Sequence, residues 1–128
     1  MRFQYIKERD RFVPIIPLKL FGKQEWVTFD AYVDSGATYS IFKQEIAEIL
    51  GIEVANGEKL FVAVADGSLI TAYLHHVKMN LANKIFDCII GFSKQLGIGF
   101  NIIGRKGVFE NFIITFNERE RYIEFIEG

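Results

Sequence analysis

An aspartate stands in a stretch of the sequence that otherwise reads as protein core. Asp34 follows the hydrophobic residues 31–33 and precedes the small residues Ser35, Gly36 and Ala37. A carboxylate in such surroundings costs free energy unless it is paired, hydrogen-bonded or used in chemistry. Gly36 permits backbone geometry that a Cβ would resist, and the Ser35 hydroxyl can bond backbone groups across the turn. These residues indicate a general base that a narrow turn holds at the end of a strand.

Amide hydrolysis that relies on carboxyl groups as both general base and general acid needs two carboxylates within hydrogen-bonding distance of each other. Two such groups cannot both ionise, so they share one proton: the charged group activates a water molecule, and the neutral group donates to the scissile carbonyl. The chain has no second Asp-Ser/Thr-Gly stretch. If the pair exists, a twofold axis must form it from Asp34 of two identical chains, because a C2 interface places identical residues opposite one another.

The elements that would position Asp34 are mostly strands. Short apolar runs rich in β-branched and aromatic residues, separated by Gly, Asn and Asp, predict an all-β chain. Two short helices are expected at Lys43–Leu50 and Arg105–Asn111. Pro14 and Pro17 each remove a ladder donor, which favours an edge or bulged position for the second strand. The predicted strands are Arg2–Lys7, Phe12–Phe21, Glu25–Val33, Lys59–Ala65, Leu69–Asn80, Lys84–Gly91, Phe112–Phe116 and Tyr122–Ile126.

A hairpin turn is predicted at Asp66-Gly67, between Ala65 and Ser68. An Asp-Gly pair between two apolar alternating runs is a strong signal for a two-residue β-turn. A protruding hairpin of this kind can be a plain connection or a lid, and the sequence leaves both interpretations open.

The composition suits one domain spanning residues 1–128, with 13 Phe to fill its core. Lys plus Arg number 15 and Asp plus Glu 16, a balance that argues against a nucleic-acid partner. The single cysteine, Cys88, rules out an internal disulfide, fits a reducing compartment and is interpreted as a buried inert thiol. His75 and His76 lack a Cys partner, so no metal site is expected. Without a secretory or membrane-spanning segment, we expect a soluble cytoplasmic protein that binds no membrane.

Three segments together resemble the retropepsin-like aspartic proteases, the retroviral protease family and its cellular relatives. Residues 31–37, Ala-Tyr-Val-Asp-Ser-Gly-Ala, look like the active-site stretch of that family. Residues 101–105, Asn-Ile-Ile-Gly-Arg, resemble the segment that crosses behind the catalytic loop, and residues 62–69 occupy the position of the flap hairpin. The Asp-Ser-Gly triplet alone is a weak signal. The three segments in this order and spacing cover nearly the whole chain and are fairly specific.

The resemblance implies a closed retropepsin-like β barrel with one or two short helices, assembled as a C2 homodimer. It implies an aspartic endopeptidase in which Asp34 of each protomer is catalytic and an extended peptide or protein substrate lies in the cleft between them. Ser35 would lock the two catalytic loops together, Gly36 would bond substrate backbone, and no metal or organic cofactor is needed. The flap residues would be Ala65, Asp66, Gly67 and Ser68, and the structural loop behind the site would be Ile103, Gly104 and Arg105.

The sequence departs from the family pattern at two places. Retroviral members have a carboxylate at the position of Thr38, where it pairs with the arginine that matches Arg105. Arg105 therefore needs another partner, such as a backbone carbonyl or a surface acid. The C-terminal strands 112–116 and 122–126 form a predicted hairpin rather than one terminal strand, so the dimer interface is expected to differ from the viral one.

Other interpretations of the same residues stay open or are rejected. Asp34 could be a turn-capping residue, and the same fold could serve as a non-catalytic dimerisation or peptide-binding module. An active protease restricted to a single partner is a third possibility. Asp34, Gly36 and Thr38 also match a phosphate-binding loop of the actin and sugar-kinase superfamily, but that architecture needs two nucleotide-clasping domains and this chain is too short for them.

Overall fold

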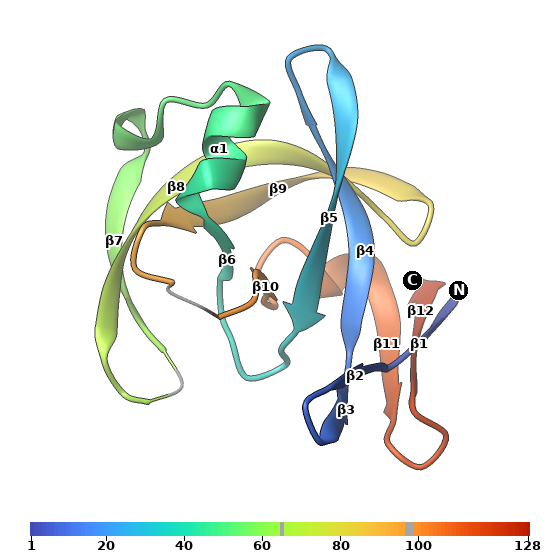
Figure 1. Cartoon of the computed structure of the whole chain (residues 1–128). Coiled ribbons are helices and arrows are strands. Elements are labelled where there is room, and N and C mark those ends of the chain that lie inside the picture. The colour runs from blue at the N-terminus through green and yellow to red at the C-terminus, as the bar shows by residue number, and fades with distance from the viewer. Residues whose placement is uncertain (65, 97–98) are drawn as a thin grey trace.

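The chain folds into a mostly-β structure, as Figure 1 shows for the computed structural model. The structure describes residues 1–64, 66–96 and 99–128. The helix α1 spans Gln44–Leu50, and two short 3₁₀ turns are η1 (Val54–Asn56) and η2 (Phe109–Asn111). The strands are β1 (Arg2–Gln4), β2 (Ile6–Glu8), β3 (Arg11–Val13), β4 (Ile15–Gly22), β5 (Glu25–Val33), β6 (Ser40–Lys43), β7 (Glu58–Ala63), β8 (Leu69–Leu81), β9 (Lys84–Ser93), β10 (Ile102–Ile103), β11 (Phe112–Asn117) and β12 (Tyr122–Glu127).

The main sheet has seven strands in the order β4-β5-β10-β6-β9-β8-β7. A further pairing of β4 with β8 closes six of them into a ring, and β7 extends the sheet beyond β8. The two-residue strand β10 lies between β5 and β6, parallel to the first and antiparallel to the second. This position puts β10 directly behind the end of β5, where Asp34 follows.

The core fills the interior of the ring. Alternation along β4 is typical of a half-buried strand: Leu18 and Leu20 are buried, whereas Pro17 and Lys19 are exposed. Helix α1 packs its buried residues against this core and ends at Gly51, which has the left-handed φ of +76° suited to that position. A second, smaller group lies under the β7–β8 hairpin; we call Ile41, Ile70 and Ala72 the hairpin cluster.

A separate three-stranded sheet joins the two ends of the chain, in the order β1-β12-β11. The predicted C-terminal hairpin is therefore present. The prediction of one strand over Arg2–Lys7 is wrong, because Tyr5 separates β1 from β2 and donates its N–H to the carbonyl of Arg121 at 2.8 Å. The prediction of one strand over Phe12–Phe21 is also wrong, because the chain breaks at Pro14, whose carbonyl accepts from Val33 N–H at 3.0 Å.

The expected helix over Arg105–Asn111 is reduced to the 3₁₀ turn η2. Two physical reasons account for this. The N–H groups of Arg105 and Lys106 bond carbonyls of the loop after Asp34, and Gly107 takes a left-handed φ of +79°. Within the described ranges, no helix is long and apolar enough to cross a membrane.

Candidate active site

Asp34 follows directly from the last residue of β5, whose position is fixed on two sides. Val33 is buried and donates its N–H to Pro14, while Asp34 N–H donates to the carbonyl of Ile103 at 2.9 Å. Ile103 is itself fully buried, at 0% exposure. The backbone that carries the carboxylate is therefore tied to the interior of the protein rather than to a surface loop.

The turn after Asp34 is closed by its own backbone and side chain. Ala37 N–H donates to the carbonyl of Asp34 at 3.1 Å, and Gly36 N–H donates to Asp34 Oδ1 at 2.8 Å. A Cβ at Gly36 would come within 3.2 Å of that same Oδ1, a contact tighter than a side chain normally makes. The small residue thus allows the carboxylate to accept from the turn, and Ser35 stays exposed at its tip.

Gly104 and Arg105 follow β10 directly and bond this turn from behind. Gly104 N–H donates to the hydroxyl of the fully buried Ser40 at 3.0 Å. Arg105 N–H donates to the carbonyl of Ala37 at 2.9 Å. A Cβ at Gly104 would lie 2.4 Å from the carbonyl oxygen of Tyr39, so only glycine allows the two backbones to approach this closely.

The side chain of Arg105 bonds the same turn from the outside. Its Nη1 donates to the carbonyl of Ser35 at 2.5 Å, and its Nη2 donates to the hydroxyl of Thr38 at 3.3 Å. The main partner of the Arg105 side chain is therefore a backbone carbonyl. The sequence had suggested either a backbone carbonyl or a surface acid. Thr38 supplies an acceptor oxygen although it supplies no charge.

Asn101 is a site residue whose role the sequence did not reveal. Its side-chain oxygen accepts from Lys43 N–H at 3.0 Å, and its amide donates to the carbonyl of Asp30 at 3.0 Å. Its own carbonyl accepts from Tyr32 N–H at 2.8 Å. One residue thus links β5, β6 and β10 next to the candidate site. The only sequence signal was its position at the start of the predicted crossing segment.

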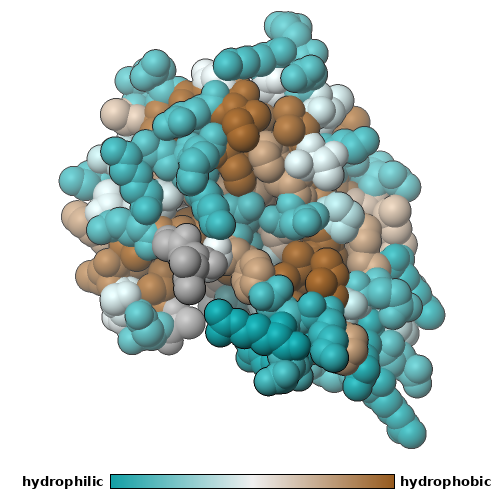
Figure 2. Space-filling view, in the orientation of Figure 1, coloured by the Kyte–Doolittle hydropathy of each residue, from teal (hydrophilic) through white to brown (hydrophobic). Residues whose placement is uncertain are grey.

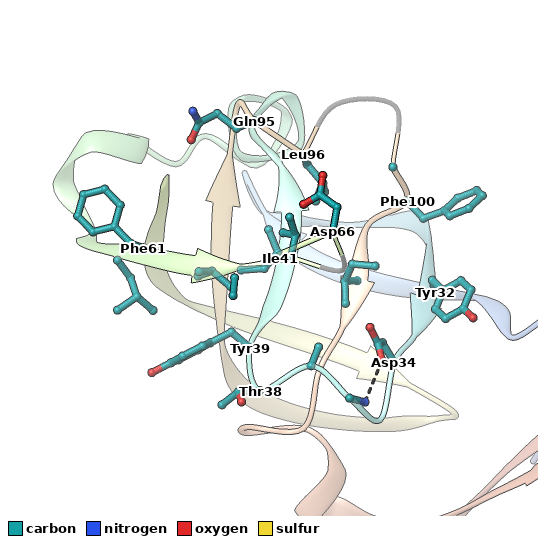
Figure 3. A pocket seen from close by; sticks show the side chains of 18 of the residues that line it. Tyr32, Asp34, Thr38, Tyr39, Ile41, Phe61, Asp66, Gln95, Leu96 and Phe100 are labelled. Atoms are coloured by element: carbon teal, nitrogen blue, oxygen red, sulfur yellow. Dashed lines mark hydrogen bonds between the residues drawn. The ribbon is translucent and has the colours of Figure 1, made fainter. Parts of the chain in front are cut away.

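A cleft of about 970 Å³ opens above Asp34. Figure 3 shows Tyr32 and Phe100 on one side of the Asp34 carboxylate and Thr38 and Tyr39 on the other. The rings of Tyr32 and Phe100 stack with their centroids 6.3 Å apart. Among the described lining residues, the ionisable groups at neutral pH are those of Asp34, Asp66 and Arg11, and most of the others are apolar. Of the predicted site residues, Asp34, Gly36, Ala37 and Asp66 line this cleft.

The β7–β8 hairpin forms the opposite wall of the cleft. Its turn is held by Asp66, whose Oδ1 accepts from Ser68 N–H at 2.9 Å and from Ser68 Oγ at 2.5 Å. The Ser68 hydroxyl first, and then the Ser68 amide, lower the pKa of Asp66 below its ordinary 3.8. Gly67 has a φ of +86°, as expected for this turn. Ala65, the remaining predicted flap residue, lies outside the described residues.

Figure 2 shows hydrophobic surface over β7. Phe61 of this strand lines the cleft and is 63% exposed. Elsewhere, Cys88 is buried and its Sγ donates weakly to the carbonyl of Val77, and burial raises the pKa of its thiol to about 12. In the part of the chain that the structure describes, no group of three His, Cys, Asp or Glu side chains is placed to hold a metal ion.

The fold is shared with solved structures, of which two are compared. One is a retropepsin-like aspartic protease from Rickettsia conorii, with 17% identity, a TM-score of 0.66, and coverage of 96% of this chain and 97% of that one. The chain has a retropepsin fold. The EIAV protease complexed with the inhibitor HBY-793 shares this retropepsin fold at 14% identity and a TM-score of 0.57, over 78% of this chain and 88% of that one. No protein-family model and no curated protein matches the sequence. The likeness to the retropepsin-like proteases stated from the three sequence segments is confirmed at the level of the fold.

Proposed function

We propose that the protein is an aspartic endopeptidase that acts as a homodimer, with Asp34 of each copy as its catalytic residue. The main support is the position of Asp34 in a retropepsin fold: its carboxylate lines the cleft, on a turn braced by Ile103, Gly104 and Arg105. Within the described ranges, no cation forms an ion pair with this carboxylate. An acid that is held firmly and left unpaired in a cleft is suited to proton transfer.

The second carboxylate of the site is assigned to a second copy of the chain. Asp66 is the other acid that lines the cleft among the described residues, but its Oδ1 already accepts two hydrogen bonds from Ser68 in the hairpin turn. A twofold axis beside Asp34 would bring two identical carboxylates together, and Ser35 at the tip of each turn would meet its symmetry mate. The pair would then titrate as a unit and hold one proton.

The chemistry follows from that shared proton. The charged Asp34 takes a proton from a water molecule, whose oxygen attacks the carbonyl carbon of the substrate. The neutral Asp34 gives its proton to the carbonyl oxygen, which forms a tetrahedral diol. The Asp34 that is now charged takes a proton from one hydroxyl of the diol, while the Asp34 that is now neutral gives its proton to the nitrogen. The C–N bond breaks, an acid and an amine are released, and the pair again holds one proton.

The substrate is an extended peptide or protein segment. Such a chain can pair its backbone with protein strands, while its side chains occupy the apolar lining around Ile41 and Ile102. The β7–β8 hairpin, with Asp66, Gly67 and Ser68 at its turn, acts as the flap that covers the bound segment and excludes water.

The decisive experiment compares the wild-type protein with two variants in cleavage of a broad peptide library between pH 3 and pH 7. Asp34→Asn should reduce the cleavage rate by at least about 10³-fold while folding and dimerisation persist. Asp30→Asn is the matched control, because it makes the same change on an exposed residue of the same strand and should leave the rate unaltered. Cleavage by Asp34→Asn at the wild-type rate would contradict the proposal.

Mixing the two kinds of chain tests the shared site directly. If both copies must supply Asp34, adding Asp34→Asn chains under conditions of subunit exchange should lower the activity per wild-type chain in proportion to the wild-type fraction. If the activity per wild-type chain did not change on addition of Asp34→Asn chains, a pair shared between two copies would be excluded. A wild-type dimer that binds peptides but cleaves none of the library would favour the non-catalytic binding module instead.

A further inference from the structure

The flap strand β8 loses its backbone partner near the cleft. The ladder between β8 and β9 runs from Leu81–Lys84 to Tyr73–Phe92. Two residues further in the same register, Thr71 would face Lys94, but β9 ends at Ser93 and the chain turns away. The N–H and C=O groups of Thr71 would therefore be left without a ladder partner at the base of the flap.

Two side chains take the place of the missing strand. Gln95 Oε1 accepts from Thr71 N–H at 2.6 Å, and Ser93 Oγ donates to the carbonyl of Thr71 at 2.6 Å. The two are joined to each other, because Gln95 N–H donates to Ser93 Oγ at 3.0 Å. We call these three residues, Thr71, Ser93 and Gln95, the latch. The N–H and C=O groups of Thr71 both point toward Ser93 and Gln95. They therefore point away from β7, which lies on the other side of β8.

The latch holds the flap at the point where it meets the cleft. Thr71 follows Ile70 of the hairpin cluster, and Leu96, next to Gln95, packs against the same cluster. Both Gln95 and Leu96 line the cleft, at the end far from Asp34 (Figure 3). At the cleft, the flap is attached by its turn, its paired strands, this small apolar cluster and the latch.

The two latch bonds differ in how easily they break. Ser93 is only 2% exposed, so its hydroxyl is a fixed part of the interior. Gln95 is exposed, and water competes for its oxygen. An exposed hydrogen bond of this kind shifts an equilibrium by roughly fivefold. This stability suits an element that must open and reclose rather than one that stays shut.

We propose that Ser93 and Gln95 are positioning residues that control the opening of the flap over the cleft. The inference rests on the proposed function, since it assigns the latch to the capture of a peptide by the Asp34 site. Loss of the Gln95 bond should increase the open population and weaken substrate binding, while the chemical step at Asp34 stays unaltered.

The direct test measures amide exchange at Thr71 by NMR in the full protein, with three variants of the loop. Gln95→Met has a side chain of similar length without an oxygen, and Thr71 should exchange about fivefold faster. Gln95→Glu keeps an acceptor oxygen and should preserve the wild-type rate. Lys94→Met alters the exposed neighbour and should have no effect. Val77, in the β8–β9 ladder, reports global unfolding and should exchange at the wild-type rate in every variant.

The exchange result decides whether the latch exists. Wild-type exchange of Thr71 in Gln95→Met would overturn the proposal, and so would equal acceleration of Thr71 and Val77, which would indicate general destabilisation. Ser93→Ala is a second variant. Because Ser93 is buried, this change could destabilise the whole protein, so its Thr71 exchange is interpreted only if its Val77 exchange matches that of the wild type.

Kinetics then decide whether the latch acts on substrate. Gln95→Met should raise KM about fivefold and change kcat by less than about twofold, and Gln95→Glu should restore the wild-type KM. Faster Thr71 exchange with an unaltered KM would overturn the proposed role in substrate capture. If the wild-type protein cleaves no peptide, the proposed function fails by itself, and the exchange of Thr71 with and without a bound peptide still decides whether the latch responds to a ligand.

Discussion

The turn that carries Asp34 and the flap that faces it are both joined to the rest of the protein by hydrogen bonds, but the bonds differ in kind. The Asp34 turn is bonded mainly backbone to backbone, through Ile103 and Arg105, with a fully buried side chain of Ser40 beneath it. The flap strand β8 is bonded backbone to backbone to β9 only as far as Tyr73, and at the cleft the flap is bonded through the side chains of Ser93 and Gln95. The wall of the cleft that carries Asp34 is therefore bonded to the core, whereas the wall formed by the flap is attached at the edge of the core.

This difference matches what each wall must do under the proposed function. A proton-transfer group must stay within a fraction of an ångström of its productive position, and the backbone bond from Asp34 to the buried Ile103 helps to hold it there. A flap must open and close in every turnover, and this requires a low local stability. The comparison predicts that equal chemical changes in the two walls will have unequal effects.

The largest difference is expected for one substitution made in each apolar cluster. Ile90 is fully buried in the main core, and Ile70 belongs to the hairpin cluster beside the cleft. Ile90→Ala should reduce the free energy of unfolding by about 4 kcal/mol and Ile70→Ala by about 2 kcal/mol, because the smaller cluster can collapse onto the space left. Urea unfolding of both variants measures this. Equal losses would mean that the flap is as firmly integrated as the core.

Two glycines give a comparison at the level of the backbone. Gly104→Ala should reduce the free energy of unfolding by about 3 kcal/mol, because its Cβ would meet the carbonyl of Tyr39 at 2.4 Å. Gly67→Ala has open space around it and meets only the strain of φ +86°, so about 1 kcal/mol is expected. Thermal unfolding of the two variants measures the difference. A larger loss of unfolding free energy for Gly67→Ala than for Gly104→Ala would mean that the flap turn is more tightly constrained than the Asp34 side of the cleft.

The smallest effect concerns pH and is confined to the flap. Ser68 lowers the pKa of Asp66 below 3.8, so the folded pKa is below the unfolded one. The stabilisation is therefore present above the unfolded pKa and is lost as the pH falls through the folded pKa. NMR titration of the Ser68 amide should show a midpoint below 3.8 and a turn that loosens in acid. Ser68→Ala should move the Asp66 midpoint upward, and a midpoint that stays in place would refute this cause.

The elements that were predicted correctly are those with a local physical signal. Apolar runs rich in β-branched and aromatic residues located β5 and most of β8 and β9, and Gly51 marked the end of α1. The Asp66-Gly67 turn follows from the backbone freedom of glycine and the short reach of the Asp side chain. The short apolar strands β6 and β10 escaped prediction, because two to four residues show no period and each is a strand only through its neighbours.

By itself, the sequence determined that this protein is mostly β and that an aspartate ends one strand in a turn of small residues, because such preferences act between residues close in the chain. The family resemblance placed Ile103 and Arg105 behind that aspartate, but only the tertiary structure decided which of their groups bond its turn. Its support comes from residues about seventy positions away, Ile103 and Arg105, and the flap is held by the loop of Ser93 and Gln95. Partners at such separations are chosen by packing and by the need to satisfy buried backbone groups, and these constraints exist only once the chain is folded.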